Sequence, residues 1–199
     1  YMYSFGKMHH TKLIDSFNSL PTDFFEKEIS IVDWGCGQGM ATMTFIDFLN
    51  QKKIKQEIKS VTLIEPSVIA LRRASLNVKK LYATSKIITV NKYLDSVTKD
   101  DFEKKKGVQK LHLFSNILDI DLFSLTNLLS LINTKFAGEN YFVCVSPFVN
   151  DTRTSRLNSF VKYFSKEKDF AQQLSIDNRT GEWQNNWTRV LRVFKVTLQ

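Results

Sequence analysis

The chain has 199 residues, of which 43% are hydrophobic and 24% charged, and this fits one globular domain with a full-sized core. It contains no run of about 18 apolar residues, which excludes a membrane-spanning helix. Its only two cysteines, Cys36 and Cys144, exclude a disulfide framework and a cysteine-based metal cluster, so we expect no metal site and a cytoplasmic location.

The net charge of +8 comes mainly from lysine, because only 7 of the 28 basic residues are arginine. A positive surface attracts nucleic acid and other polyanions, so the charge is consistent with RNA as a partner. Lysine-rich helices that simply face water give the same charge, and arginine is the better residue for bidentate phosphate recognition. The charge therefore leaves RNA binding open.

The first 27 residues precede the first strong strand pattern. Leu13, Ile14, Phe17 and Leu20 have helical spacing, and Pro21 is expected to end that helix. We interpret residues 1–27 as an N-terminal helical extension or lid, and residues 28–199 as the main domain. The chain begins at Tyr1 rather than at Met, which is typical of a piece of a longer protein.

Strand and helix patterns alternate along the rest of the chain. Strands are expected where Ile, Val, Leu and Phe cluster in short runs, and helices where apolar residues recur every three or four positions. In chain order the patterns predict strand 28–34, helix 40–50, strand 60–65, helix 67–80, strand 86–90, strand 111–115, helix 122–133, strand 141–145, helix 154–164, strand 172–176 and strand 189–197.

This alternation predicts an α/β fold with a doubly wound, mostly parallel seven-stranded sheet and helices on both faces. Most of the strand runs are almost continuously apolar, as strands buried on both faces should be. The last two strands are joined by the polar residues 177–188, which have no strong helical pattern. We therefore expect these two strands to form an antiparallel hairpin at one edge of the sheet.

A glycine-rich turn follows the first strand of the main domain, in the segment 31–39 with the sequence IVDWGCGQG. Glycine allows a tight turn and lets a ligand approach the backbone, and the N–H groups at the helix start then face that ligand. The glycines follow the spacing G-x-G-x-G, which differs from the G-x-G-x-x-G fingerprint of nicotinamide-binding proteins. The turn also lacks the Gly-Lys-Ser/Thr ending of a Walker A loop.

The spacing Asp33-x-Gly35-x-Gly37-x-Gly39 resembles the first motif of class I, Rossmann-like S-adenosylmethionine-dependent methyltransferases. The resemblance covers residues 28–147 best and implies S-adenosylmethionine as the cofactor. It implies that Asp33 orders the loop or the amino end of the cofactor. It also implies that the methionine part lies along the loop residues Gly35, Cys36, Gly37, Gln38 and Gly39. We interpret Cys36 as a small apolar filler, because no histidine or other base neighbours it in the sequence.

A second element of the resemblance stands at the end of the second strand, where Glu65 is followed by Pro66 and Ser67. In the family, an acidic residue at this place accepts hydrogen bonds from both ribose hydroxyls, and a carboxylate offers the two acceptors that this needs. The alternative role for Glu65 is a cap on the N-terminus of the next helix. Because the glycine turn precedes it by one βα unit, we favour the cofactor role for Glu65 and its neighbour Pro66.

A third, weaker element follows the third strand. The resemblance places adenine contacts there, and the candidates in this sequence are Asn91, Tyr93 and Leu94. An ordinary loop is the alternative interpretation of this segment.

The end of the fourth strand faces the reactive methyl group in the family. Here it carries Ser115 and Asn116 as candidate cofactor contacts, and Asn116 and Asp119 as candidate catalytic residues. Many enzymes that methylate amino groups have the motif Asn/Asp-Pro-Pro-Tyr/Phe at this position, and this sequence does not. The difference counts against adenine-N6 and glutamine chemistry.

The resemblance implies methyl transfer from S-adenosylmethionine to an acceptor that the sequence does not identify. The sulfonium methyl is already activated, so such a protein mainly supplies position and orientation. The positive charge favours RNA or a ribosome-related acceptor, and a small molecule or a protein is the alternative. A different class of function also fits, in which the domain binds the cofactor, or only keeps the fold, as a sensing or interaction module of a larger protein.

Overall fold

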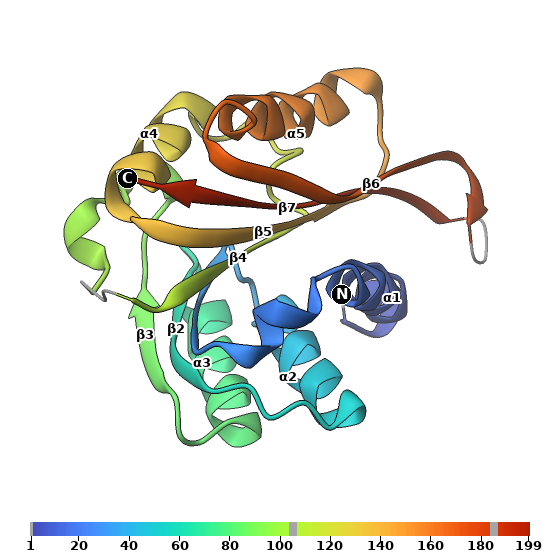
Figure 1. Cartoon of the computed structure of the whole chain (residues 1–199). Helices are drawn as coiled ribbons and strands as arrows, with labels where there is room; N and C mark the ends of the chain where they lie inside the picture. Colours follow the sequence, from blue (N-terminus) through green and yellow to red (C-terminus); the bar gives the residue numbers. More distant parts are fainter. Residues whose placement is uncertain (1, 104–106, 184–186) are drawn as a thin grey trace.

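A computed structural model describes residues 2–103, 107–183 and 187–199, and within these residues seven strands form one sheet (Figure 1). The strands are β1 (Ile29–Trp34), β2 (Ile58–Ile64), β3 (Lys86–Val90), β4 (Gln109–Ser115), β5 (Gly138–Ser146), β6 (Lys168–Trp183) and β7 (Trp187–Leu198). Their order across the sheet is β3-β2-β1-β4-β5-β7-β6. Strands β1 to β5 run parallel, whereas β7 is antiparallel to both β5 and β6. The expected fold class is confirmed, including the antiparallel edge hairpin.

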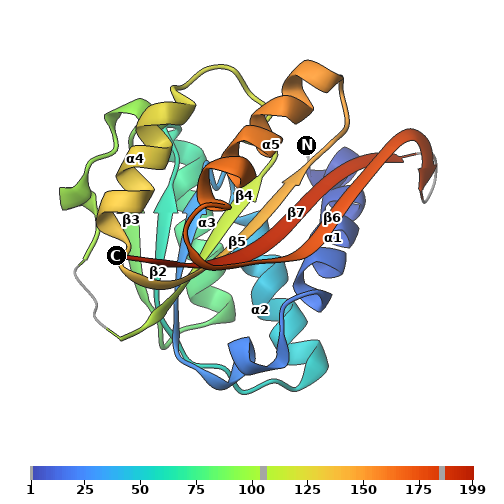
Figure 2. The same cartoon turned by 45° about the horizontal axis from the view of Figure 1, so that its top comes forward.

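Helices cover both faces of this sheet (Figure 1 and Figure 2). One face carries α1 (Met2–Asn18), α2 (Met40–Lys52) and α3 (Val68–Leu81), and the other carries α4 (Leu125–Lys135) and α5 (Asp151–Phe164). Short 3-10 helices are η1 (Thr22–Glu26), η2 (Leu94–Ser96) and η3 (Lys99–Asp101). Within the described residues, no helix combines the length and the apolar character that crossing a membrane requires.

The core has two layers, because successive strand residues point to opposite faces of the sheet. The layer beneath α1, α2 and α3 contains Ile31, Val61, Leu111 and Val143, and it also includes Leu13 and Phe17 of α1. The Phe17 ring lies 5.1 Å from the ring of Phe45 in α2. The N-terminal helix is therefore packed into the same core as the sheet.

The second layer, beneath α4 and α5, is aromatic and contains one buried polar group of three side chains. Trp34 stacks on Phe114 with ring centroids 5.7 Å apart, and its Nε1 donates to Nδ1 of His112 at 3.2 Å. The other ring nitrogen of His112 lies 3.0 Å from Oδ1 of Asn140. Burial lowers the pKa of His112 to about 3, so this imidazole is neutral at pH 7 and both its nitrogens have partners.

Polar caps set where the helices begin, and one of them corrects an expected boundary. Helix α4 begins at Leu125 rather than at residue 122, because the Ser124 hydroxyl accepts the N–H of Asn127 at 3.2 Å. Leu122, which has the apolar character of a helix residue, is 87% exposed in the preceding loop. The expected helix therefore began too early, because the apolar residues before Ser124 continue the helical pattern although they lie in the loop.

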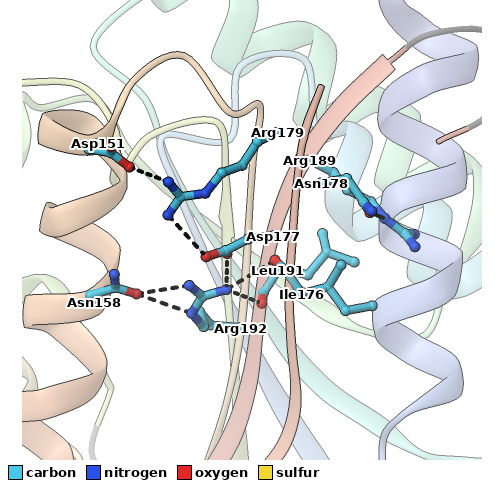
Figure 3. Close-up of polar contacts among 9 residues, drawn as sticks. All are labelled: Asp151, Asn158, Ile176, Asp177, Asn178, Arg179, Arg189, Leu191 and Arg192. Atoms are coloured by element: carbon cyan, nitrogen blue, oxygen red, sulfur yellow. Dashed lines mark hydrogen bonds and ion pairs between the residues drawn. The ribbon is translucent and has the colours of Figure 1, made fainter. Parts of the chain in front are cut away.

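The edge hairpin of β6 and β7 is much longer than expected. Strand β6 spans Lys168–Trp183 rather than 172–176, so most of the polar stretch 177–188 is strand. Figure 3 shows what stabilises it: Arg192, which is 5% exposed, donates to Oδ1 of Asn158 in α5 and pairs with Asp177 at 2.7 Å. Arg179 continues the network to Asp151, also in α5, at 2.8 Å. Ion pairs connect this polar part of β6 to α5 and β7. Because it lacks an alternating apolar pattern, the sequence pattern did not predict it as a strand.

Candidate functional site

The strand order reverses between β1 and β4, because the chain continues from β1 to β2 on one side while β4 lies on the other. In open α/β sheets, ligands bind outside the carboxyl ends of the strands at such a reversal. The turn Gly35–Gly39 follows β1 at this edge, and Ser115 and Asn116 stand at the end of β4. The topology thus brings two of the sequence motifs to one place.

Asp33 fixes the glycine turn to the first turn of α2. It is 1% exposed, and its Oδ2 accepts the hydroxyl of Thr42 at 2.7 Å and the N–H of Thr42 at 3.3 Å. Burial raises the pKa of this carboxyl to about 6, against the two hydrogen bonds that lower it. The two hydrogen bonds tie the end of β1 to the start of α2 and so order the glycine turn between them.

Glu65 connects the second motif to the first. One carboxylate oxygen accepts the N–H of Gly37 at 3.1 Å, and the other accepts the N–H of Ser67 at 3.0 Å. The second bond lies at the start of α3, so Glu65 does contribute to the beginning of that helix. The first bond places the same carboxylate beside the glycine turn.

The candidates for adenine contacts separate in the structure. Asn91 donates its amide Nδ2 to the carbonyl oxygens of Glu65 and Pro66, each at 2.9 Å, and so ties the ends of β2 and β3 together. Tyr93 is 75% exposed beside this tie, while Leu94 packs against the aromatic core layer. The Tyr93 ring is therefore accessible from solvent, whereas Leu94 is partly buried.

A cavity of about 270 Å³ lies beside the glycine turn. Its lining includes six of the expected cofactor contacts, namely Gly35, Cys36, Gly37, Gln38, Ser115 and Asn116. Four further residues complete the lining, and these are His9, Met40, Ala41 and Ala70. Met40, Ala41 and Ala70 are small or apolar residues near the starts of α2 and α3. The sequence signal for them is their position shortly after the glycine turn and after Glu65. Burial raises the pKa of the Cys36 thiol above its usual value, as expected for a filler rather than a nucleophile.

Asn116 and His9 meet across this cavity. Asn116 has φ of 56°, an unusual conformation for a residue other than glycine, and its Nδ2 lies 3.1 Å from Nδ1 of His9. Its Oδ1 is buried and has no hydrogen-bond partner among the described residues. Burial, with a smaller contribution from Lys12, lowers the pKa of His9 to about 4, so the imidazole is neutral at pH 7.

The second catalytic candidate, Asp119, does not line the cavity. It is 5% exposed, and its Oδ1 accepts the hydroxyl of Ser146 at 3.0 Å. Lys12 of α1 is near enough for its charge to interact with that of Asp119, and it is fully buried, with no hydrogen-bond partner for its Nζ among the described residues. The structure thus keeps Asn116 at the cavity and places Asp119 in a buried polar cluster under α1.

Comparisons with known proteins support the fold. No protein-family model and no curated protein matches the sequence significantly. Among solved structures, an rRNA methylase from Streptococcus thermophilus matches with a TM-score of 0.56 and 16% identity, over 97% of this chain and 96% of that one. A protein from Listeria monocytogenes, assigned as an S-adenosylmethionine-dependent methyltransferase, matches with a TM-score of 0.54 and 14% identity, over 94% and 98%. A protein from Clostridium thermocellum, assigned as an rRNA methylase, matches with a TM-score of 0.57 and 12% identity, over 90% of this chain and 96% of that one. The chain has the class I S-adenosylmethionine-dependent methyltransferase fold.

Proposed function

We propose that this chain is an S-adenosylmethionine-dependent methyltransferase whose cofactor binds in the cavity beside the glycine turn. The observation that carries the proposal is the hydrogen bond from the Gly37 N–H to the Glu65 carboxylate. It joins the two most specific motifs of the sequence, of which Gly37 lines the cavity and Glu65 contacts Gly37 without lining the cavity itself. The names of the three similar structures support the same activity.

The residues at this edge fit the cofactor. A Cβ atom at Gly37 would meet no described atom within 4 Å, so the turn leaves open space beside its backbone for a ligand. Glu65 would hold the ribose hydroxyls, because a carboxylate has about four lone-pair sites and Gly37 and Ser67 occupy only two. Tyr93 would lie against the adenine. Asn91 would hold the segment that carries Tyr93 in place, through its hydrogen bonds to the carbonyl oxygens of Glu65 and Pro66.

The chain's own groups would then orient the acceptor. When bound, S-adenosylmethionine supplies an activated methyl group that a nucleophilic atom of the acceptor attacks in line. The buried Oδ1 of Asn116 has no partner within the described part of the chain and would accept an N–H or O–H of the acceptor. His9 is neutral, so it adds no positive charge beside the cofactor's sulfonium. Rate enhancement in such a site comes mainly from position and orientation.

We further propose that α1 is the lid of this site. His9 lines the cavity, and Asp15, six residues later on the same helix, pairs with Arg189 of β7. A cover of this kind excludes water from the transfer step. Because Leu13 and Phe17 pack α1 into the core, this lid would stay in place over the cavity as a fixed cover.

The cofactor proposal is tested by titrating the purified protein with S-adenosylmethionine in a calorimeter, with NAD and ATP as controls. We expect selective micromolar binding that Glu65→Ala weakens at least tenfold, which is about 1.4 kcal/mol. Glu65→Gln keeps the shape of the side chain but removes its charge, and it should also weaken binding. Glu26→Ala removes an exposed carboxylate in η1 and should leave binding unchanged. If the folded protein binds no S-adenosylmethionine, the chain is a scaffold or interaction module and its protein partners become the question.

RNA is the acceptor class that a specific observation favours. Ala70 lines the cavity, and the exposed residues Arg72 and Arg73 follow it on α3, with Arg73 one turn further along the same helix face. Two of the three similar structures are named as rRNA methylases. We therefore propose an RNA acceptor, with a small molecule or a protein as the alternatives.

Salt dependence tests the RNA proposal. Binding of a labelled RNA hairpin, measured by fluorescence anisotropy, should weaken steeply as salt is added, because phosphate contacts release counterions. Arg72→Gln with Arg73→Gln should weaken binding and lower the slope of log K against log salt by about 1 to 2. Lys162→Gln, at an exposed site on α5, is the control. An absence of binding at low salt would remove RNA as the acceptor.

A further inference from the structure

A second concave site lies on the other face of the sheet. Between β3 and β4, the described residues form only η2 and η3, so no α-helix covers β1, β2 and β3 on the side of α4 and α5. A groove of about 500 Å³ lies there. It shares no lining residue with the cofactor cavity. The groove is therefore separate from the proposed methyl-transfer site.

The floor of the groove is polar where a parallel sheet is normally apolar. Ser30 of β1 and Ser60 and Thr62 of β2 line it, and each is at most 9% exposed. The Ser60 hydroxyl donates to the Ser30 hydroxyl at 3.1 Å. Side chains from neighbouring strands thus form a row of buried hydroxyl groups at the base of an open space.

The walls and one end of the groove have a different character. Phe102 and Phe136 form an apolar wall, with rings 5.0 Å apart. At the end, Lys110 is 7% exposed and donates from its Nζ to the carbonyl oxygen of Ala137 at 2.6 Å. Lys135 donates from its Nζ to the carbonyl oxygens of Lys99 and Phe102, each at 2.7 Å.

Three charged side chains line the groove: Lys110, Lys135 and Glu103. The Glu103 carboxylate is paired with Lys86, so the buried Lys110 gives the groove its charge preference. An ammonium group has three N–H donors, and only one of those on Lys110 has a hydrogen bond to a described residue. Among the ion pairs of the described residues, none gives Lys110 a carboxylate partner. Burial lowers the pKa of Lys110, which is the cost of holding this charge away from water. A bound anion would supply the missing partner and reduce that cost.

We propose that this groove is a ligand-binding site for a small aromatic carboxylate. The carboxylate would bind the Nζ of Lys110, and the ring would lie between the aromatic wall and the hydroxyl floor. The combination follows the usual plan of small-molecule sites, in which apolar walls bury the ligand and a few polar groups fix its orientation. This site would operate independently of the cofactor cavity.

The probes are naphthoate and its neutral isostere naphthamide, titrated by calorimetry and by amide chemical shifts in NMR spectra. We expect naphthoate to bind at least tenfold more tightly than naphthamide, with shift changes centred on Ser30, Thr62 and Phe136. Lys110→Met should remove this preference and weaken naphthoate binding at least tenfold, whereas Lys162→Met should leave the binding of both probes unchanged. Excess S-adenosylmethionine should not displace the probe.

A second variant covers the case in which Lys110→Met does not fold. Ile88→Trp places a larger side chain at the half-buried rim of the groove, on β3, and should also abolish naphthoate binding. The proposal is overturned if naphthoate does not bind, if naphthamide binds equally well, or if S-adenosylmethionine competes with the probe. Failure of the proposed methyltransferase activity would leave all these measurements unaffected.

Discussion

Lys12→Met is expected to raise the free energy of unfolding by about 3 kcal/mol at pH 7. The wild-type ammonium is fully buried, and its Nζ has no hydrogen-bond partner among the described residues. Burial lowers the pKa of Lys12 from 10.5 to about 8, and the charge of Asp119 offsets only part of that effect. Each unit of pKa shift corresponds to about 1.4 kcal/mol, so relieving this cost gives the stated gain. Methionine keeps the length of the side chain and removes the charge.

The pH dependence of stability identifies the cause. Between pH 8 and pH 10.5, the unfolded chain holds a proton on Lys12 that the folded chain has lost. Because the unfolded state then binds more protons, the stability of the wild type should rise with pH across this window, and the full cost is present below it. The Lys12→Met variant should lack this rise, so the two unfolding free energies should converge toward pH 10.5. Urea denaturation at a series of pH values measures both.

Lys7→Met is the matched control, since Lys7 is exposed on the same helix. Its effect should stay within about 0.5 kcal/mol at every pH. A loss of stability in Lys12→Met would contradict the prediction and would mean that Lys12 is the necessary counter-charge of Asp119. In that case, adding Asp119→Asn to the variant should restore stability, because the unpaired carboxylate is then gone.

Local motifs predicted from the sequence which residues would lie together at the candidate site. The glycine turn and Glu65 each combine a strand end with residues of specific chemistry, and the topology rule then places them at one edge. The structure adds the bond between Gly37 and Glu65, which spacing alone cannot show. The end of β4 was predicted in the same way, and Asn116 does reach the cavity.

What the sequence could not show depends on packing between distant segments. Asp119 stands only three residues after Asn116, yet the chain turns it away from the cavity toward Ser146. The burial of Lys12 depends on where α1 docks, and a charged residue on a helix is normally expected to face water. The second groove lies where the described residues between β3 and β4 form no α-helix. The sequence patterns predict no helix there either, but they do not show that this face of the sheet stays open. Local patterns thus predict the order of the elements, whereas buried charges without partners and open faces emerge only from the assembled fold.

Gly39→Ala is expected to lower the free energy of unfolding by about 3 kcal/mol, through two separate effects. Gly39 has φ of 83°, which costs any residue with a Cβ atom about 1 to 2 kcal/mol. Its new Cβ would also lie 3.1 Å from Cβ and 3.2 Å from Cα of Ala74 in α3, so the two helices would have to move apart. Gly39 stands directly before α2, and its carbonyl accepts the N–H of Met43 at 2.9 Å, so such a movement would disturb the glycine turn as well.

Gly107→Ala separates the two effects, because Gly107 has φ of 76° and a Cβ there would meet no atom of the described residues within 4 Å. It should cost only the backbone strain, about 1 to 2 kcal/mol, and should leave S-adenosylmethionine binding unchanged. Combining Gly39→Ala with Ala74→Gly should recover part of the loss, since the variant then lacks one of the two contacting Cβ atoms, and a double-mutant cycle measures that coupling. Equal losses for Gly39→Ala and Gly107→Ala in urea denaturation would show that the approach of α3 to the turn contributes nothing. A larger loss of stability for Gly39→Ala than for Gly107→Ala would establish that α2, α3 and the glycine turn share one closely packed contact. The geometry of the candidate site would then depend on how the two helices meet.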